Sequence, residues 1–401
     1  MSTTDRPVRV LNVLGGTDLG GAESRIMDLL RHMDRDSVVF DFLVHMDPVE
    51  YRKAVSSGVS PESLRKEQHF DREIRDLGGR IFAVPRPEPG DYSFYSKAVK
   101  RFFEEHKGEF SVLEGHMTST APVYMKIAAE YGIHPIVCHV RSAGTGKGFK
   151  GFLRKLLRRN AGKRADILFS CSEKAAKAVF GNRKSYFVPN AVETGKFVFD
   201  SKNRADVRSE YGLSGCRVIG HIGRFSYPKN HTFLLKVFAD IAASQKDVRL
   251  LLVGDGELFP EVRKEAESLG IGDLVVFTGS RSDPERFYSA MDVLVFPSRY
   301  EGMPGTVIEA QANGLPCLIS DTISGDTAVC ETVKTLSLGA DVSSWGKQAL
   351  SMMDGEEGHR ETVSAGNTEK LKEALYDVEA LSERLKVFYT GGGIDLPLTG
   401  G

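Results

Sequence analysis

Apolar and polar positions in the first half of the chain form short apolar runs separated by amphipathic stretches. The apolar run at residues 8–14 ends in a Gly-rich segment, and residues 22–33 then place Ile26, Leu29 and Leu30 on one helical face. Further apolar runs predict strands at residues 38–44, 80–84, 110–113, 136–140, 167–170 and 186–188. Helical stretches separate most of these strands, and this alternation predicts a parallel sheet with helices on both faces.

The same alternation starts again after Pro189 and Asn190. It predicts strands at residues 217–221, 249–253, 275–278, 293–297 and 317–320, with helices at 231–245, 257–269, 284–290 and 306–313. A polar helical region follows at 369–389, and the Gly-rich tail from Thr390 is expected to be flexible. We therefore predict two α/β domains, a hinge near residues 190–205, and ligands bound at the carboxyl ends of the strands.

Composition narrows the possible partners only a little. The 401 residues suit two domains, and 41% hydrophobic with 27% charged residues is an ordinary soluble composition. Lys and Arg number 53 against 54 for Asp and Glu, so no overall field selects nucleic acid. The five cysteines are far apart and form no C-x-x-C pair, which indicates a reduced, cytosolic setting. We expect no signal peptide, and no apolar stretch approaches the ~20 residues of a membrane-spanning helix.

The segment from Val295 to Ala310 carries the strongest chemical signal. A predicted buried strand ends in a loop that contains Glu301, and a Gly-rich stretch then leads into a helix that carries Glu309. The amide groups and positive dipole end of such a helix favour phosphate, and Gly302 and Gly305 allow close backbone approach. Acidic residues near a helix start can also serve only to stabilise the helix, so this segment alone leaves both interpretations open.

Two cations follow another predicted strand end, at Arg224 and Lys229. Fixed cations beside a helix start suit a diphosphate whose negative charge grows as it leaves. In the first domain, Gly20 and Gly21 open a helix after the first strand, and His116 lies just past a later strand. The Gly-rich segment does not match the G-x-G-x-x-G fingerprint of dinucleotide binding.

Together these segments resemble glycosyltransferase family 4, over nearly the whole chain. The landmarks occur in the family's order: Gly20-Gly21-Ala22, His116, Gly223-Arg224 with Lys229, and the E-x7-E pair Glu301 and Glu309. The resemblance implies the GT-B fold, in which two Rossmann-like α/β domains have parallel sheets facing across a cleft. It places an acceptor-side domain at 1–195 and a nucleotide-sugar donor domain at 196–370. Residues 371–401 would form a C-terminal helical region that returns to the first domain, followed by the tail.

The resemblance also implies a role for each matched residue. Arg224 and Lys229 would neutralise the donor diphosphate. Glu301 would hold hydroxyls of the transferred sugar, while His116 would lie beside its reacting face. Donor-binding contacts are expected at Gly21, Asn190, Gly223, Arg281, Met303, Pro304, Gly305, Thr306 and Glu309.

Members of this family retain anomeric configuration, so the expected activity is that of a retaining hexosyltransferase. The resemblance favours a UDP-sugar donor, with a GDP-sugar next, and bacterial capsular or exopolysaccharide synthesis with a glycan or polyprenyl-linked acceptor. No cofactor and no metal ion are expected. The D-x-D sequence Asp34-Arg35-Asp36 lies between a predicted helix and strand, far from the donor segments, and is interpreted as a solvated turn.

Two positions depart from the family pattern on the acceptor side. Relatives often carry a second histidine two positions before His116, where this chain has Glu114. The strand end Cys138-His139-Val140-Arg141-Ser142 replaces a segment that is richer in His and Asn in relatives. The acceptor therefore cannot be transferred by analogy.

A basic amphipathic helix is predicted between Lys147 and Arg164. Its apolar face includes Phe149 and Phe152, and its cations would gain about 1 kcal/mol each near an anionic bilayer. We predict peripheral contact with the inner face of the plasma membrane, made by Phe149, Phe152, Arg154, Lys155 and Arg158. A basic helix that simply packs by its apolar face is the alternative.

Three other functions are compatible with parts of the pattern. A nucleotide-sugar epimerase of similar build would not need the Glu301 and Glu309 pair. A non-catalytic nucleotide-sugar-binding protein would keep the donor residues without transfer. An oxidoreductase is disfavoured by the missing dinucleotide fingerprint.

Overall fold

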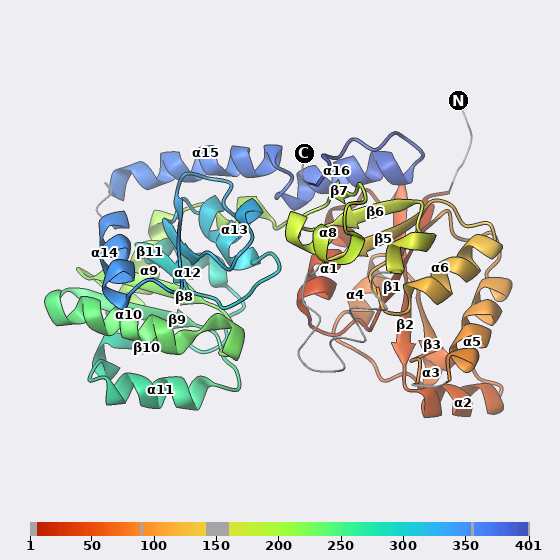
Figure 1. Ribbon diagram of the computed structural model, residues 1–401, viewed down its shortest axis with the longest axis horizontal. Helices are drawn as coiled ribbons and strands as arrows, with labels where there is room; N and C mark the ends of the chain where they lie inside the picture. Colours follow the sequence, from red (N-terminus) through yellow and green to blue (C-terminus); the bar gives the residue numbers. More distant parts are fainter. Residues whose placement is uncertain (1–5, 89–90, 142–159, 354–356, 400–401) are drawn as a thin grey trace. The chain divides into compact units, whose positions relative to one another are not determined.

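The computed structural model of the chain describes residues 6–88, 91–141, 160–353 and 357–399 (Figure 1). The chain divides into two compact units. Unit 1 comprises Met1–Asn190 and Val378–Gly401, and unit 2 comprises Ala191–Asp377.

Unit 1 contains a seven-stranded parallel sheet with the order β3-β2-β1-β4-β5-β6-β7. Its strands are β1 Val8–Leu14, β2 Val38–Met46, β3 Ile81–Pro85, β4 Val112–Gly115, β5 Ile136–Val140, β6 Ile167–Ser170 and β7 Tyr186–Phe187. The chain builds outward from β1 to β3 and then returns to place β4 on the other side of β1. This reversal creates a switch point between β1 and β4, where ligands of open α/β sheets bind at the carboxyl ends.

Helices cover both faces of this sheet. They are α1 Gly21–His32, α2 Pro48–Ser56, α3 Pro61–Leu64, α4 Asp71–Asp76, α5 Tyr92–Glu105, α6 Ala121–Glu130, α8 Glu173–Phe180 and α16 Val378–Tyr389, with a 3₁₀ turn η1 Ala161–Arg164. One face packs against α5 and α6 through an aromatic core that includes Tyr95, Phe103 and Tyr124. On the other face α1 and α16 lie together (Figure 1), and Tyr389 of α16 meets Phe40 of β2 edge to face.

Unit 2 contains a six-stranded parallel sheet with the order β10-β9-β8-β11-β12-β13. Its strands are β8 Arg217–Ile222, β9 Val248–Val253, β10 Val275–Phe277, β11 Val293–Phe296, β12 Cys317–Ser320 and β13 Val333–Leu336. Its helices are α9 Ser201–Glu210, α10 His231–Ser244, α11 Phe259–Ser268, α12 Pro284–Ala290, α13 Gly305–Ala312, α14 Val342–Met352 and α15 Arg360–Glu373. The 3₁₀ turns are η2 Thr194–Phe197, η3 Tyr227–Lys229, η4 Gly272–Leu274, η5 Gly325–Thr327 and η6 Glu357–His359. The switch point of this sheet lies between β8 and β11.

The C-terminal segment differs from the expected helical region at 369–389. The helix is interrupted after α15, where Leu375 adopts a positive φ of 63°, and α16 then belongs to unit 1. The Gly-rich tail, expected to be flexible, is hydrogen-bonded to the edge of the first sheet. Phe187 donates its amide to the carbonyl of Pro397 at 2.7 Å, and Leu398 forms a bridge with Tyr186. The tail therefore covers the edge strand β7, whose unpaired backbone groups would otherwise be open to another chain.

Candidate functional site

The loops that follow β8 and β11 are bonded to each other at the switch point of unit 2. The amide of Arg299 donates to the carbonyl of Pro228 at 2.7 Å, and the side-chain amide of Asn230 donates to the carbonyl of Pro297 at 3.0 Å. Asn230 stands at φ 59°, a left-handed conformation that asparagine tolerates better than most residues. These contacts bring two segments that are about seventy residues apart in sequence to the same sheet edge.

Lys229 and Glu301 form the centre of this arrangement. The Lys229 Nζ atom lies 2.7 Å from Glu301 Oε1, and each side chain is 17% exposed. The hydroxyl of Ser298 donates to the same carboxylate oxygen at 3.2 Å. The ammonium group also lies 4.5 Å from the centre of the Phe296 ring, a cation–π distance. A cation and a carboxylate are thus held in place, partly shielded from water, in the loops at the carboxyl ends of β8 and β11.

Glu309 lies on α13 and is held by a residue of another helix. The hydroxyl of Tyr288, on α12, donates to Glu309 Oε2 at 2.7 Å. Burial first, and then the neighbouring carboxylate, raise the pKa of Tyr288 well above its ordinary value, so the phenol stays a donor. A Cβ atom on Gly305 would lie 3.4 Å from the other oxygen, Glu309 Oε1, so the start of α13 lies directly beside this carboxylate.

The first turn of α13 presents backbone donors at the same place. The helix begins at Gly305 after Pro304 in the N-cap position, and no side chain caps its start among the described residues. Met303 just before it is buried, with 6% exposure, and fixes the approach of the loop. The amide groups of Gly305 and Thr306, which lie between Glu301 and Glu309 in the sequence, are therefore placed to donate hydrogen bonds to an anion.

Gly223 lies where the loops after β8 and β9 touch. Its amide donates to the carbonyl of Val253 at 2.9 Å. A Cβ atom on Gly254 would fall 2.1 Å from the Gly223 carbonyl oxygen, and one on Gly256 would fall 2.5 Å from that of Phe225. The glycines of the turn after β9 are therefore required by the close approach of the loop that carries Arg224.

The structure does not bring the side chains of Arg224 and Arg281 into this cluster. Arg224 is 75% exposed and pairs with Glu257 at 3.3 Å. Arg281 pairs with Asp283 at 2.9 Å, and its guanidinium faces the ring of Phe287. The hydrogen bond from Arg281 lowers the pKa of Asp283 to about 2. The side chain of Arg281 is thus occupied, which leaves its backbone for any contact with a nucleobase.

The sequence-predicted residues of unit 1 fall at that unit's own switch point. Gly21 is the first residue of α1, and outside its own helix no atom of the described residues lies within 4 Å of where its Cβ would be. The preceding loop is anchored at Thr17, whose hydroxyl bonds to Asp71 and Arg65. The ring of His116 follows β4, and Asn190 accepts a hydrogen bond from Arg141 at 3.3 Å.

His116 belongs to a buried polar network that the sequence did not predict. Its Nε2 atom lies 3.2 Å from Asn12 Oδ1, and its Nδ1 atom accepts from Arg141 Nε at 3.3 Å. Glu114 accepts from His139 Nδ1 at 2.7 Å and from the hydroxyl of Tyr389. Burial alone would raise the pKa of Glu114, but the bond from His139 and the nearby positive charge bring it to about 2.

The side chains of Glu114, His116 and His139 are the described residues that most resemble a set of metal ligands, with ligand atoms within 4.8 Å of one another. Glu114, His116 and His139 Nδ1 are bonded within the network, whereas His139 Nε2 has no partner among the described residues, and the Arg141 guanidinium beside them opposes a further cation. We therefore interpret them as a hydrogen-bonded network. The prediction of no metal ion concerns the donor site, and it stays a prediction.

Tyr288, Ser298 and Tyr389 are the supporting residues that sequence reasoning missed. Tyr288 lies 21 positions from Glu309, and Tyr389 lies 275 positions from Glu114. No local pattern marks such contacts, because only the folded chain brings them together. Arg141 did carry a signal, since it stands in a strand-end segment that departs from the family pattern.

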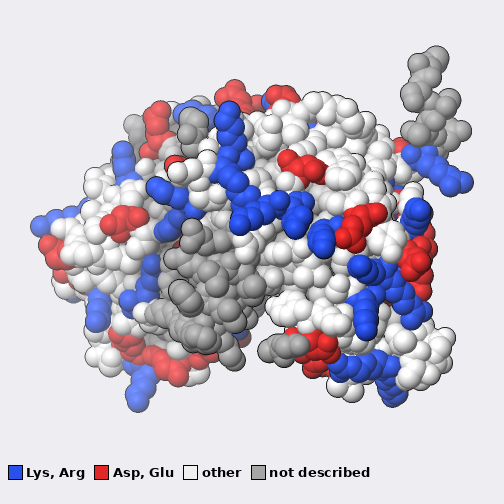
Figure 2. Space-filling view, turned by 45° about the vertical axis from the view of Figure 1, so that its right-hand side comes forward, with Lys and Arg blue, Asp and Glu red and all other residues white. Residues whose placement is uncertain are grey.

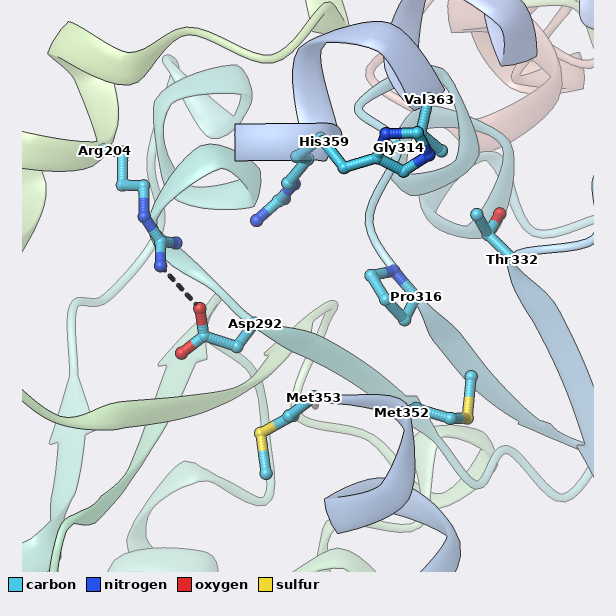
Figure 3. A pocket seen from close by; sticks show the side chains of 10 residues that line it. Arg204, Asp292, Gly314, Pro316, Thr332, Met352, Met353, His359 and Val363 are labelled. Carbon is cyan, nitrogen blue, oxygen red and sulfur yellow. Dashed lines mark hydrogen bonds and ion pairs between the residues drawn. The ribbon is translucent and has the colours of Figure 1, made fainter. Parts of the chain in front are cut away.

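A pocket of about 180 Å³ lies at the opposite end of the unit 2 sheet (Figure 3). Asp292, Pro316 and Thr332 line it, and each directly precedes a strand, β11, β12 or β13. Asp292 is bound by Arg204 at 2.7 Å, and a second arginine, Arg360, also lines the pocket. The pocket lies away from the carboxyl ends where ligands of such sheets bind, and we assign it no function.

Across the face drawn in Figure 2, acidic side chains are set among basic ones. None of the helices within the described ranges is long and apolar enough to cross a membrane. The predicted membrane-contact residues Phe149, Phe152, Arg154, Lys155 and Arg158 lie outside the described residues.

Comparison with known proteins matches both units to one family. The model of the glycosyl transferase 4-like domain matches residues 20–190, and that of glycosyl transferases group 1 matches residues 216–354. The putative glycosyltransferase EpsF of Bacillus subtilis is 34% identical over 349 residues, which cover 84% of this chain and 85% of EpsF. A galactosyltransferase of Escherichia coli, UDP-Gal:alpha-D-GlcNAc-diphosphoundecaprenol alpha-1,3-galactosyltransferase, is 31% identical over 147 residues, 35% of this chain and 38% of that enzyme.

Solved structures share the architecture at low sequence identity. HepE of Anabaena, in complex with UDP and glucose, superimposes with a TM-score of 0.71 at 15% identity and covers 96% of this chain and 100% of HepE. Sucrose-phosphate synthase of Thermosynechococcus elongatus gives a TM-score of 0.71 at 17% identity, over 95% and 98% of the two chains. These structures show the fold, and the extended match to EpsF shows the family. The chain belongs to glycosyltransferase family 4 and has the GT-B fold.

Proposed function

We propose that this glycosyltransferase moves a sugar from a UDP-sugar to a glycan or lipid-linked acceptor in polysaccharide synthesis, with retention of anomeric configuration. The observation that carries the proposal is the Lys229–Glu301 pair beside the uncapped first turn of α13. The donor assignment is supported by the E. coli relative, whose name specifies UDP-Gal and a diphosphoundecaprenol acceptor. It is further supported by the complexes of HepE with UDP and with UDP-glucose.

The residues of unit 2 have the chemistry that such a donor needs. The ammonium group of Lys229 and the amides of Gly305 and Thr306 would bind the diphosphate. These groups would stabilise the negative charge that grows on the diphosphate as it leaves. Glu301 and Glu309 are acceptors suited to sugar and ribose hydroxyls. Because Lys229 supplies positive charge at the point where the leaving group departs, we propose that transfer needs no divalent metal.

In the proposed reaction the bond between C1 of the sugar and the phosphate oxygen breaks. The acceptor oxygen forms the new bond on the same face, and its proton passes to the departing phosphate. Positioning and charge stabilisation, rather than a strong side-chain base, would supply the acceleration.

We propose a cytoplasmic enzyme that contacts the inner face of the plasma membrane through residues 147–164. The proposal comes from the sequence of that segment, most of which lies outside the described residues. Flotation with anionic vesicles tests it, with wild type compared to the Phe149→Ser/Phe152→Ser variant. Lower recovery of the variant supports membrane contact, and equal recovery overturns it.

The activity itself is tested by incubating the protein with a panel of UDP-sugars in EDTA and measuring the release of UDP. We expect the protein to turn over one UDP-sugar and to form an α-linked product from the α-linked donor. The Lys229→Ala variant should leave that UDP-sugar unconsumed. Lys236→Ala, an exposed position on α10, is the matched control. Conversion of one UDP-sugar into another without UDP release would identify an epimerase. Tight UDP binding without any turnover, with extracted glycan and polyprenyl acceptors present, would identify a binding protein.

A further inference from the structure

The buried network of unit 1 holds one carboxylate from two sides. Glu114, on β4, is 3% exposed, and its Oε1 atom accepts from His139 Nδ1 at 2.7 Å. Its Oε2 atom accepts from the hydroxyl of Tyr389, which comes from the C-terminal helix α16. The position of Glu114 is therefore fixed by β5 and by a helix that lies more than 270 residues further along the chain.

The hydrogen bond from Arg141 determines where the proton of His116 lies. A guanidinium group has only donors and stays charged in proteins, so His116 Nδ1, 3.3 Å from Arg141 Nε, must be the acceptor. The proton of a neutral His116 ring is then on Nε2. That atom lies 3.2 Å from Asn12 Oδ1, which accepts its proton, and 3.6 Å from Glu114 Oε1, which is beyond hydrogen-bond distance.

Glu114 and Arg141 flank this ring with opposite charges. Glu114 lies on the Nε2 side and Arg141 on the Nδ1 side. The other end of the guanidinium donates to Asn190 at 3.3 Å. Among the residues that the structure describes, the charged and titratable groups that act on this cluster are Arg25 of α1, Glu114, His116, His139, Arg141, Cys171 and Tyr389. The two places where the sequence departs from the family pattern are Glu114 and the strand end that contains Arg141. They therefore supply the two opposite charges that flank His116.

We propose that Arg141 is the counter-ion of Glu114, and that the two, acting across the ring, keep His116 a neutral hydrogen-bond donor through Nε2. The inference rests on the proposed function for the placement of His116 at the reacting face of the donor sugar. Arg141 is then the fixed cation at this sheet edge, and His116 is neither a base nor a cation. In this respect Glu114 and Arg141 are positioning residues.

The electrostatics of the cluster agree with this arrangement. Burial lowers the pKa of His116 well below its ordinary value, Glu114 raises it, and Arg141 lowers it again. The pKa of His139 is lowered to about 4, first by burial and then by Arg141, against the pull of Glu114. Without Arg141 only burial would oppose the attraction of Glu114, and we expect a histidine to become the counter-ion.

Nitrogen-15 NMR of the full-length protein, labelled at histidine, tests the proposal directly. The signals of His116 are assigned with a His116→Gln variant and followed between pH 5 and 8. In wild type we expect a neutral His116 with the proton on Nε2 throughout. In Arg141→Met we expect His116 or His139 to become protonated within this range, an upward shift of about two pH units or more.

The double variant Glu114→Gln/Arg141→Met removes both charges, and both rings should be neutral again. Arg101→Met, which removes a surface arginine paired with Glu105, is the control and should leave both rings as in wild type. A wild-type His116 that is protonated near neutral pH, or that carries its proton on Nδ1, overturns the proposal. Unchanged titration of both rings in Arg141→Met overturns it as well.

The outcome is separable from the proposed function. UDP binding is expected from residues of unit 2, whereas these titrations concern unit 1 in the absence of any nucleotide. A protein that fails to bind UDP but shows the predicted titrations would keep the counter-ion pair and lose the donor assignment. A protein that binds UDP but does not show the predicted titrations would support the donor site and overturn the counter-ion pair.

Discussion

The ammonium group of Lys229 lies 2.7 Å from the carboxylate of Glu301, and the two side chains are equally shielded from water. In the proposed reaction these groups serve different parts of the donor, the diphosphate and the sugar. Without the donor they neutralise each other, which avoids an unpaired charge in a partly buried site. In the proposed reaction, donor binding would exchange this ion pair for contacts of both groups with the ligand.

Removal of the cation should affect turnover strongly. In Lys229→Ala we expect kcat/KM for the UDP-sugar to fall by about 100- to 1000-fold, because the growing charge of the leaving diphosphate loses its fixed partner. Steady-state kinetics with Lys236→Ala as the control measure this. A loss of less than about threefold, beyond that of the control, would contradict a direct role of Lys229 in catalysis.

The phenol of Tyr288 should matter for the nucleotide. Tyr288→Phe removes the 2.7 Å hydrogen bond that holds Glu309, and the loss of one such bond is worth about 0.5–1.5 kcal/mol. We therefore expect UDP to bind about two- to tenfold more weakly in calorimetric titration. Tyr131→Phe, in unit 1, is the control. An unaltered affinity for UDP in Tyr288→Phe would contradict a role of the Tyr288 hydrogen bond in positioning Glu309 for the ribose.

The turn after β9 should tolerate no side chain at Gly254. This residue has φ 143°, and an added Cβ would collide with the Gly223 carbonyl oxygen at 2.1 Å. Gly254→Ala should displace the loop with Arg224, weaken UDP binding at least tenfold, and lower the urea midpoint. Gly270 has φ 69°, and no atom in the described part of the chain would lie within 4 Å of an added Cβ, so Gly270→Ala should cost only about 1 kcal/mol and leave UDP binding intact. Equal effects of the two substitutions would contradict the close approach of these loops.

Stability should decline in mild acid because several histidines are buried in the neutral form. Burial, as the first cause, lowers the pKa values of His45, His139 and His231 to about 4. Their unfolded pKa is about 6.5, so the unfolded chain binds protons first as the pH falls. Stability is thus fully present above about pH 6.5 and is lost toward pH 4, by about 1.4 kcal/mol per pH unit for each histidine.

His231 offers a test of this slope. Both of its ring nitrogens lack a hydrogen-bond partner in the part of the chain that the structure describes, and the ring stacks on Phe225 at 4.1 Å. His231→Phe should lower by one the number of protons that the chain takes up on unfolding in mild acid, and so reduce the slope of the unfolding free energy against pH. The variant should be more stable than wild type at pH 5. Urea unfolding at pH 7.5, 6.5, 5.5 and 5.0 measures both. An unchanged slope would show that His231 does not titrate on unfolding.

The sequence predicted the elements whose apolar runs have clear ends. The strands at 8–14, 136–140, 167–170 and 317–320 have the predicted bounds, because an apolar run there is bounded by Gly, Pro or polar residues. The helix at 284–290 also has the predicted bounds, and it begins at Pro284, a residue favoured in the first helical turn. Strand β13 was missed because it is a short edge strand with two exposed residues among its four. The interruption between α15 and α16 was missed because Leu375 takes its positive φ without a glycine or proline to mark it.

The candidate site divides in the same way. Glu301, Glu309 and Lys229 stand in local patterns at strand ends, which sequence reading can detect. Tyr288 and Tyr389 act through contacts made only in the folded chain, and no spacing encodes them. The exposed placement of Arg224 depends on its pairing with Glu257, one strand further on, which the local pattern also does not contain.

The donor-site assignment is tested most directly by a calorimetric titration in EDTA with UDP, GDP, ADP and NAD. Wild type is compared with Glu309→Ala and with Glu331→Ala, a matched carboxylate that is 95% exposed. We predict selective binding of UDP that Glu309→Ala weakens at least tenfold and Glu331→Ala leaves unchanged. Tight binding of NAD, or UDP binding that is indifferent to Glu309, would contradict the assignment of the segment from Glu301 to Glu309 as the donor site.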